Sequence, residues 1–201
     1  MKLGLVAQIS LITIVLIVPS LRAQSPDARR LAAEVCASCH GPTGHSSSPA
    51  FPRLAGQTKE YLASQLTAFR DRTRGDPMAQ AFMWGMASQL SDDTIAKVAA
   101  YYSVQKAVPG KPGDPKLVRE GQAIFEEGIP AAKVEACVAC HLEHDGGIPR
   151  LAGQHLGYLV KQLALFNNEL RAEANAPVMH SVSVGMTFDQ MRAVAAYLAS
   201  R

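Results

Sequence analysis

Two short motifs in the chain each combine two cysteines with a histidine. One is "EVCASCH", residues 34–40, and the other is "EACVACH", residues 135–141. In both motifs two residues separate the cysteines and the histidine follows at once, which is the attachment pattern of haem c. The spacing lets both thiols reach the two vinyl groups of one haem, while the histidine lies beneath the iron. The motifs predict two covalent haem c groups, with thioether bonds from Cys36, Cys39, Cys137 and Cys140 and proximal iron ligation by His40 and His141.

Other uses of these residues are less consistent with the pattern. All four cysteines of the chain lie in the two motifs, so two disulfides would be the ordinary expectation for an exported protein. A thioredoxin-like redox pair would need a βαβ pattern around it, which the sequence lacks. A zinc site would use the same side chains, but export and the adjacent Cys-His pair disfavour it. Covalent haem accounts for every cysteine in both copies.

The second ring nitrogen of each proximal histidine also needs a partner, because an acceptor fixes the tautomer and the orientation of the ring. A backbone carbonyl near Pro52 or Pro149 is the candidate in each copy. The alternative is that these prolines serve only the local turn.

An internal repeat organises the rest of the chain. "FPRLAGQTKEYLASQLTAFRD" (51–71) matches "IPRLAGQHLGYLVKQLALFNN" (148–168) at an offset of 97 residues, and "IAKVAAYYS" (95–103) matches "MRAVAAYLA" (191–199) at an offset of 96. Between the copies, "KAVPGKPGDPKL" has the composition of a linker. We expect a domain at 24–106, a linker at 107–114 and a second domain at 115–201.

The repeat also selects candidates for the distal side of each iron. A methionine is usually core filler. Met83 and Met179, however, each lie eight residues before an expected helix N-cap, at Ser91 and Thr187, and no other methionine pair is equivalent. We therefore expect Met83 and Met179 to be the distal ligands, on irregular chain before a helix, with Met86 as the alternative in the first copy.

The remaining histidines and several repeated polar residues have weaker claims. His45 and His144 are too close to the attachment motifs, and His155 and His180 have no histidine counterpart in the first copy. Three polar pairs recur and could contact haem edges or propionates, or could simply belong to a shared packing scaffold. These pairs are Gln57 with Gln154, Tyr61 with Tyr158, and Arg53 with Arg150.

Helices must position all of these groups. Apolar residues recur at helical spacing, as in Leu62, Leu66 and Phe69 and their counterparts, and no convincing alternating strand pattern occurs. Ser91 and Thr187 are good N-caps, followed by acidic residues that suit the helix dipole. The sequence predicts an all-α protein with helices at about 27–38, 58–70, 115–127 and 155–170 and after the two N-caps.

The first 23 residues have the layout of a secretory signal peptide. A lysine near the start precedes an apolar run and a small-residue site that ends at Ala23. Cleavage there would remove Lys2 and Arg22, and the formal charge would fall from +3 to +1. The chain shows no dense basic stripe with interleaved aromatics, so it gives no indication of nucleic-acid binding. We expect a cleaved leader and a periplasmic protein; the alternative is an uncleaved anchor, for which the apolar run is short.

Taken together, the motifs resemble one known family. The two C-x-x-C-H units, the repeated "PRLAGQ…YL…QL…F", the methionine before "LSDD" and the closing "AAYY" are similar to those of the dihaem cytochromes of the c4 type. The likeness covers essentially the whole mature chain. It implies two class I cytochrome c domains whose haems face each other across a polar interface, with axial pairs His40–Met83 and His141–Met179. The shortened "CHLEHDGG" loop departs from the family pattern, because Leu142 stands where the first copy has Gly41. This departure bears on how exposed the second haem is and leaves the expected iron ligands unchanged.

Three functions compete for such a protein. The resemblance implies a periplasmic electron carrier, in solution or loosely at the membrane, between a membrane electron donor and a terminal oxidase. The second interpretation is the dihaem electron-accepting subunit of a dehydrogenase, and the third is a dihaem peroxidase. Histidine and methionine together fill both axial positions and raise the potential, so substrate has no open site. The sequence thus favours electron transfer over enzymatic activity.

Overall fold

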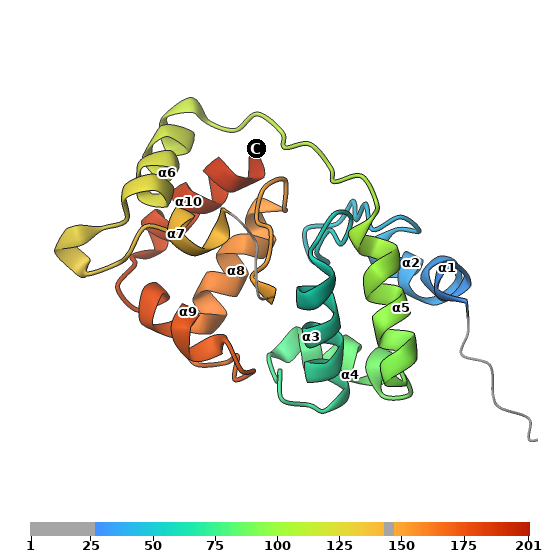
Figure 1. Ribbon diagram of the computed structural model, residues 1–201. Helices are drawn as coiled ribbons and strands as arrows, with labels where there is room; N and C mark the ends of the chain where they lie inside the picture. Colours follow the sequence, from blue (N-terminus) through green and yellow to red (C-terminus); the bar gives the residue numbers. More distant parts are fainter. Residues whose placement is uncertain (1–26, 143–146) are drawn as a thin grey trace, which may run out of the picture.

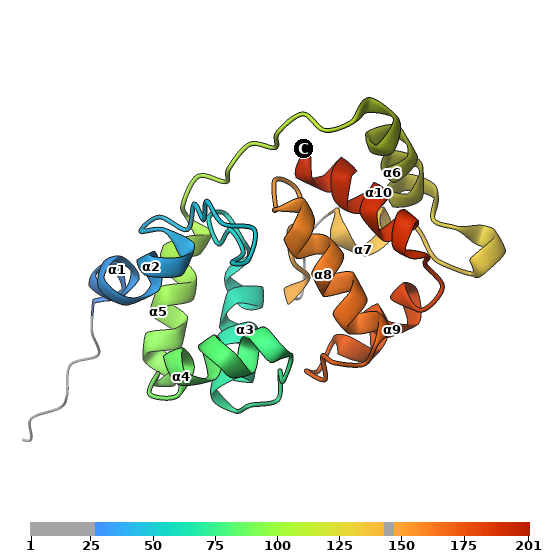
Figure 2. The same ribbon diagram turned by 180° about the vertical axis from the view of Figure 1, so that it is seen from behind.

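The computed structural model describes residues 27–142 and 147–201. The predicted signal peptide, residues 1–23, lies outside this range, as does His144. The described chain forms two groups of helices that lie side by side (Figure 1), and an extended segment without helix connects them. The same two groups are seen from behind in Figure 2.

The N-terminal group packs around the contact between its first and last helices. Ala32 and Ala99 are both fully buried there, and these small side chains let the two backbones approach closely. The first helical stretch ends with the haem motif: His40 is its last residue and Gly41 is its C-cap. The elements are α1 (Ala28–Leu31), η1 (Ala32–Cys36), α2 (Ala37–His40), α3 (Lys59–Arg70), η2 (Ala79–Met83), α4 (Trp84–Ala87) and α5 (Asp92–Ser103).

The C-terminal group repeats this plan. Its first and last helices meet at Gly121, where an added Cβ would lie 1.9 Å from the Ala193 carbonyl oxygen. Only glycine permits so close a crossing of the two helices. The elements are α6 (Pro115–Glu127), η3 (Pro130–Ala132), α7 (Val138–His141), α8 (Leu156–Asn167), α9 (Ala176–Ser183) and α10 (Phe188–Ala199).

The expected helices are largely confirmed. Ser91 Oγ accepts the Thr94 amide at 3.2 Å, and Thr187 forms a complete capping box with Gln190. One expectation was wrong: Met83 and Met179 lie within helical segments, η2 and α9, rather than on irregular chain before a helix.

The described residues contain no strand, only an isolated bridge between Ile129 and Val134. The fold is all-α with two tandem domains, as the sequence predicts. Within the same residues, no helix is both long and apolar enough to cross a membrane.

Candidate haem centres and the domain interface

The proximal histidines make the same contact in both domains. His40 Nδ1 lies 2.9 Å from the Pro52 carbonyl oxygen, and His141 Nδ1 lies 3.0 Å from the Pro149 carbonyl oxygen. A carbonyl can only accept, so Nδ1 carries the proton in each ring. The lone pair of the neutral ring is then on Nε2, the nitrogen that faces a metal in such an arrangement. The expected proline carbonyls are thus confirmed as the acceptors.

None of the four cysteines forms a disulfide, so all four are available for thioether bonds. Each pair lies on the same short helical stretch as its histidine. Two thiols and one oriented imidazole per domain are the donor set that a haem c requires.

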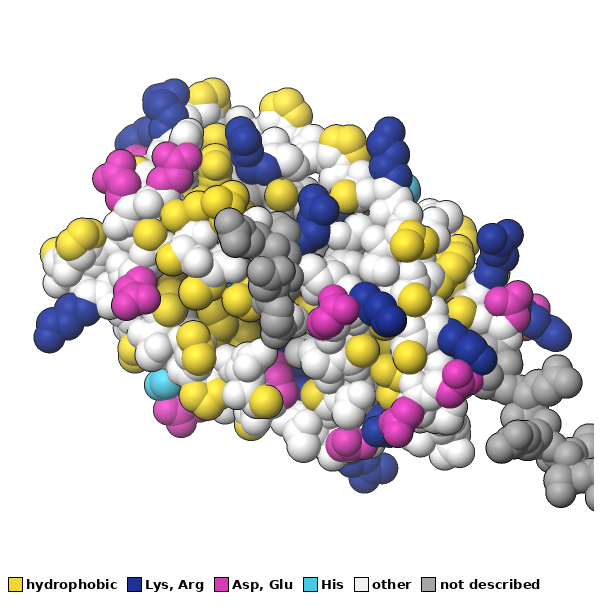
Figure 3. All heavy atoms as spheres, in the orientation of Figure 1, with side chains coloured by type: hydrophobic (Ala, Val, Ile, Leu, Met, Phe, Trp, Pro, Cys, Tyr) yellow, Lys and Arg dark blue, Asp and Glu magenta, His cyan; other side chains and the backbone are white. Residues whose placement is uncertain are grey.

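The apolar surface of the C-terminal domain also fits a haem. Figure 3 shows hydrophobic side chains gathered on the face formed by α7, α8 and α9. Leu142, Leu170 and Val178 are at least half exposed in this part of the chain. A porphyrin would cover such a surface, because its body is large and apolar.

Ring contacts link Met83's helical segment to the first proximal histidine. The Phe82 ring lies 5.8 Å from that of Phe51, which in turn lies 6.1 Å from the His40 ring. Met83 itself is half-buried beside Phe69, whereas Met86 is 55% exposed.

In the second domain, the methionines divide by burial. Met186 and Met191 are buried members of the hydrophobic core, at 7% and 4% exposed. Met179 is half-buried on α9, outside that core cluster. Two of the three methionines of this domain therefore belong to the hydrophobic core.

The described histidines outside the motifs contact backbone carbonyls. His45 Nε2 lies 2.7 Å from Lys106 O, and His155 Nε2 lies 3.0 Å from Ser46 O. His180 Nδ1 lies 2.9 Å from Phe166 O. In His45 and His155 the contact uses Nε2, and His180 Nε2 lies 3.1 Å from Glu169 Oε1. That none of the three is an iron ligand stays a prediction.

The two domains hold each other through a reciprocal pair of glutamines. Gln57 Oε1 accepts the Arg150 amide at 2.8 Å, and Gln57 Nε2 donates to the Arg150 carbonyl at 2.9 Å. Gln154 makes the same two bonds to Arg53, at 2.9 and 3.0 Å. We call these four hydrogen bonds the glutamine clasp. They show that the repeated glutamines serve the interface between the domains.

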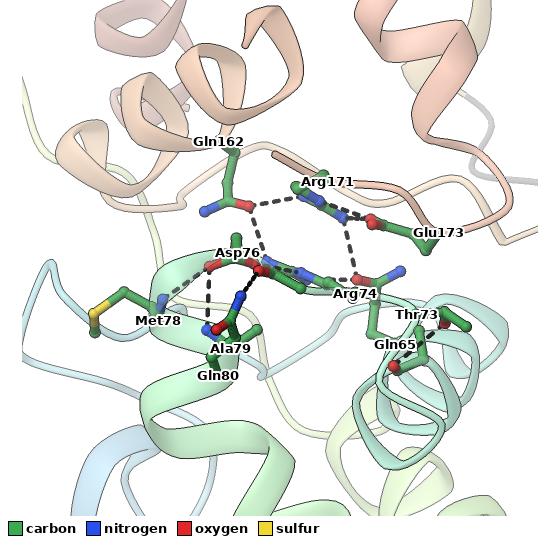
Figure 4. Close-up of polar contacts among 12 residues, drawn as sticks. Gln65, Thr73, Arg74, Asp76, Met78, Ala79, Gln80, Gln162, Arg171 and Glu173 are labelled. Carbon is green, nitrogen blue, oxygen red and sulfur yellow. Dashed lines mark hydrogen bonds and ion pairs between the residues drawn. The ribbon is translucent and has the colours of Figure 1, made fainter. Parts of the chain in front are cut away.

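A second contact, the arginine ring, consists of Gln65, Arg74, Gln162 and Arg171 (Figure 4). Gln65 Oε1 and Gln162 Oε1 each accept hydrogen bonds from both arginines, one from either domain. The Arg74 guanidinium lies over the Phe69 ring at 4.8 Å, and that of Arg171 lies over Phe166 at 4.1 Å.

Each buried cation of the ring has an acid of its own domain. Arg74 pairs with Asp76 at 3.1 Å, and Arg171 pairs with Glu173. Burial would lower the pKa of Arg74, but the Asp76 carboxylate and a hydrogen bond with Tyr158 outweigh burial and raise it. Burial raises the pKa of Tyr158, so its hydroxyl stays protonated. Tyr158 therefore lies beside the arginine ring as a neutral group.

Sequence reasoning missed the arginine ring, although a signal was present. Gln65 and Gln162, Arg74 and Arg171, and the positions of Asp76 and Glu173 are all separated by the offset of 97 that defines the repeat. The last two pairs lie beyond the segment whose residues match closely.

The profile of the cytochrome c family matches the chain twice, at residues 26–103 and 118–201. Cytochrome c4 of Pseudomonas aeruginosa is 36% identical, covering 83% of this chain and 83% of the relative. The thiosulfate dehydrogenase electron acceptor of Stutzerimonas stutzeri is 44% identical over 90% of this chain and 89% of the relative.

Solved structures agree with the sequence relatives. Cytochrome c4 of Acidithiobacillus ferrooxidans superposes with a TM-score of 0.75 at 38% identity, covering 83% of this chain and 98% of that one. The duplicated family match, the two histidine–carbonyl pairs and the symmetric interface lead to one conclusion. The chain belongs to the cytochrome c family, as a two-domain member of the c4 type that binds two covalent haem c groups and carries electrons rather than catalysing a reaction.

Proposed function

We propose that this cytochrome carries single electrons through the periplasm to a terminal oxidase, with His40–Met83 and His141–Met179 as the axial pairs of its two irons. The observation that carries the proposal is the equivalence of the two sites. In each domain the histidine Nδ1 donates to a proline carbonyl, at 2.9 and 3.0 Å, and one half-buried methionine lies on a helix at the equivalent position.

The residues explain why electron transfer is favoured. Each bound haem supplies one-electron chemistry, and the protein sets its potential through the axial ligands, burial and hydrogen bonds. The cysteines tether the porphyrin, and the proline carbonyl holds the imidazole in one tautomer. Met83 and Met179 would supply the second ligand of each iron, which would leave no position for substrate or water to bind.

The ligand assignment is tested by the spectra of oxidised Met83→Ala and Met179→Ala variants. Each variant should lose half of the weak near-red absorption band that arises from sulfur-to-ferric charge transfer. Met86→Ala, a control three residues along the same helical stretch, should keep the full band. If Met86→Ala loses half of the band and Met83→Ala does not, the first assignment is wrong.

A second candidate for the partner rests on a specific comparison. The 44% identity to a thiosulfate dehydrogenase electron acceptor extends over 90% of the chain, which favours the role of acceptor for a periplasmic dehydrogenase. Purification from the native cell separates the two roles. A free carrier elutes alone, whereas co-elution of a stoichiometric dehydrogenase would refute the free-carrier proposal.

The proposal of a periplasmic carrier includes cleavage of the leader near Ala23. The intact mass of the periplasmic protein should equal residues 24–201 plus two haems. A retained leader would add the mass of 23 residues and contradict this part of the proposal.

A further inference from the structure

One peptide group in each domain joins the proximal histidine to the opposite domain. The Pro52 carbonyl accepts from His40 Nδ1 at 2.9 Å. The N–H of the same peptide group belongs to Arg53 and donates to Gln154 Oε1, from the other domain, at 2.9 Å. A single planar unit thus touches a predicted iron ligand at one end and the partner domain at the other.

The second domain mirrors this arrangement. The Pro149 carbonyl accepts from His141 Nδ1 at 3.0 Å, and the N–H of that peptide, from Arg150, donates to Gln57 Oε1 at 2.8 Å. Gln57 and Gln154 are both buried, at 8% exposed, so water competes little for these bonds. Each glutamine oxygen also accepts the amide of the residue that follows it, Thr58 at 2.9 Å and His155 at 3.0 Å.

We propose that Gln57 and Gln154 are positioning residues that act across the domain interface. Each orients and polarises the peptide group that holds the proximal histidine of the other domain's haem. The proposal rests on His40 and His141 being the proximal ligands. It adds that the potential of each haem depends on a glutamine of the opposite domain.

The direction of the effect follows from the polarity of the peptide group. A hydrogen bond that accepts the peptide N–H draws electron density toward the carbonyl oxygen, and bonds in such a chain strengthen one another. The carbonyl then accepts more strongly from Nδ1–H, so the imidazole becomes a better donor to the metal. A better donor stabilises the ferric state, so the glutamine of the opposite domain lowers the potential.

The reciprocal variants Gln154→Met and Gln57→Met test this crossed dependence. Met retains length and removes both polar groups. Gln154→Met should raise the potential of the haem of the first domain by about 30 to 59 mV, a three- to tenfold change in its reduction equilibrium. The other haem should change by less than a third of this. Gln57→Met should give the mirror result. The haems are distinguished by NMR, through contacts between the haem methyls and residues of each domain.

The control is His155→Thr, which installs the residue found at the equivalent position of the first copy, Thr58. It removes the contact of His155 with Ser46 across the interface and leaves the clasp intact. Both potentials should stay within about 10 mV of wild type, roughly a 1.5-fold change in the reduction equilibrium.

A further variant covers the case in which Gln154→Met fails to assemble. Gln154→Glu keeps the acceptor and makes it stronger, so it should lower the potential of the first haem more than that of the second. A shift of the same domain's haem, equal shifts of both haems, or no shift in Gln154→Met would overturn the proposal. The Met83→Ala and Met179→Ala variants report on iron ligation separately, so the ligand assignment and the role of the glutamines can fail independently.

Discussion

Replacing Gln162 by leucine should destabilise the N-terminal domain, although the residue belongs to the other domain. Gln162 Oε1 accepts from Arg74 at 2.9 Å and from Arg171 at 2.7 Å. Both guanidinium groups are buried, at 5% and 6% exposed, so water cannot replace the lost acceptor.

The magnitude follows from these two bonds. A hydrogen bond to a charged group contributes about 1.5–3 kcal/mol. Each arginine keeps its carboxylate and its bond to Gln65, and the two losses share one acceptor, so they are not fully additive. We expect Gln162→Leu to lower the free energy of docking and unfolding by roughly 3 kcal/mol.

The chain contains a suitable probe, its single tryptophan, Trp84. Trp84 Nε1 donates to the Arg74 carbonyl at 2.8 Å, so its environment reports on the N-terminal side of the ring. Denaturant titration of the holoprotein should show the Trp84 transition at lower denaturant in Gln162→Leu. Gln162→Glu retains the acceptor oxygen and should keep wild-type stability or exceed it. A loss below about 0.5 kcal/mol for the leucine variant, the level of an ordinary surface change, would refute the reasoning.

Three further variants test other parts of the structure. Gly121→Ala should destabilise the C-terminal domain by about 3 kcal/mol in denaturant titration, because its Cβ would meet the Ala193 carbonyl. Thr187→Ala removes the capping box of α10 and should cost about 1 kcal/mol in the same assay. Burial, then the charge of Arg53, lowers the pKa of His155, so the unfolded chain binds this proton more readily and stability should fall as pH drops from 7 to 5. His155→Thr should flatten this dependence in thermal melts across that pH range.

The sequence predicts the parts of the site that are local in the chain. Cysteine and histidine spacing, the proline after each motif and the N-caps at Ser91 and Thr187 each depend on a few neighbouring residues. The same holds for the all-α class, because helical periodicity is a local signal. The structure confirms these features.

The remaining features of the site depend on which surfaces of the two domains and of their helices pack against each other. The repeat singles out Gln57 and Gln154, but a pattern within one copy cannot show that the partner of a glutamine is the backbone of the other copy. The helical state of Met83's segment was missed because η2 and α4 are short elements, whose apolar residues Ala79, Met83 and Ala87 pack against Phe69. Tertiary packing decides such short elements.

The arginine ring and the glutamine clasp obey the rule of a symmetric homodimer, in which residue i contacts residue j and the counterpart returns the contact. Two copies of one domain could therefore pair through the same surface as separate molecules. Joining them by a short linker makes the pairing intramolecular, with an effective concentration in the millimolar range. The pairing then no longer depends on how much protein the cell holds, so two redox centres always arrive at a partner together.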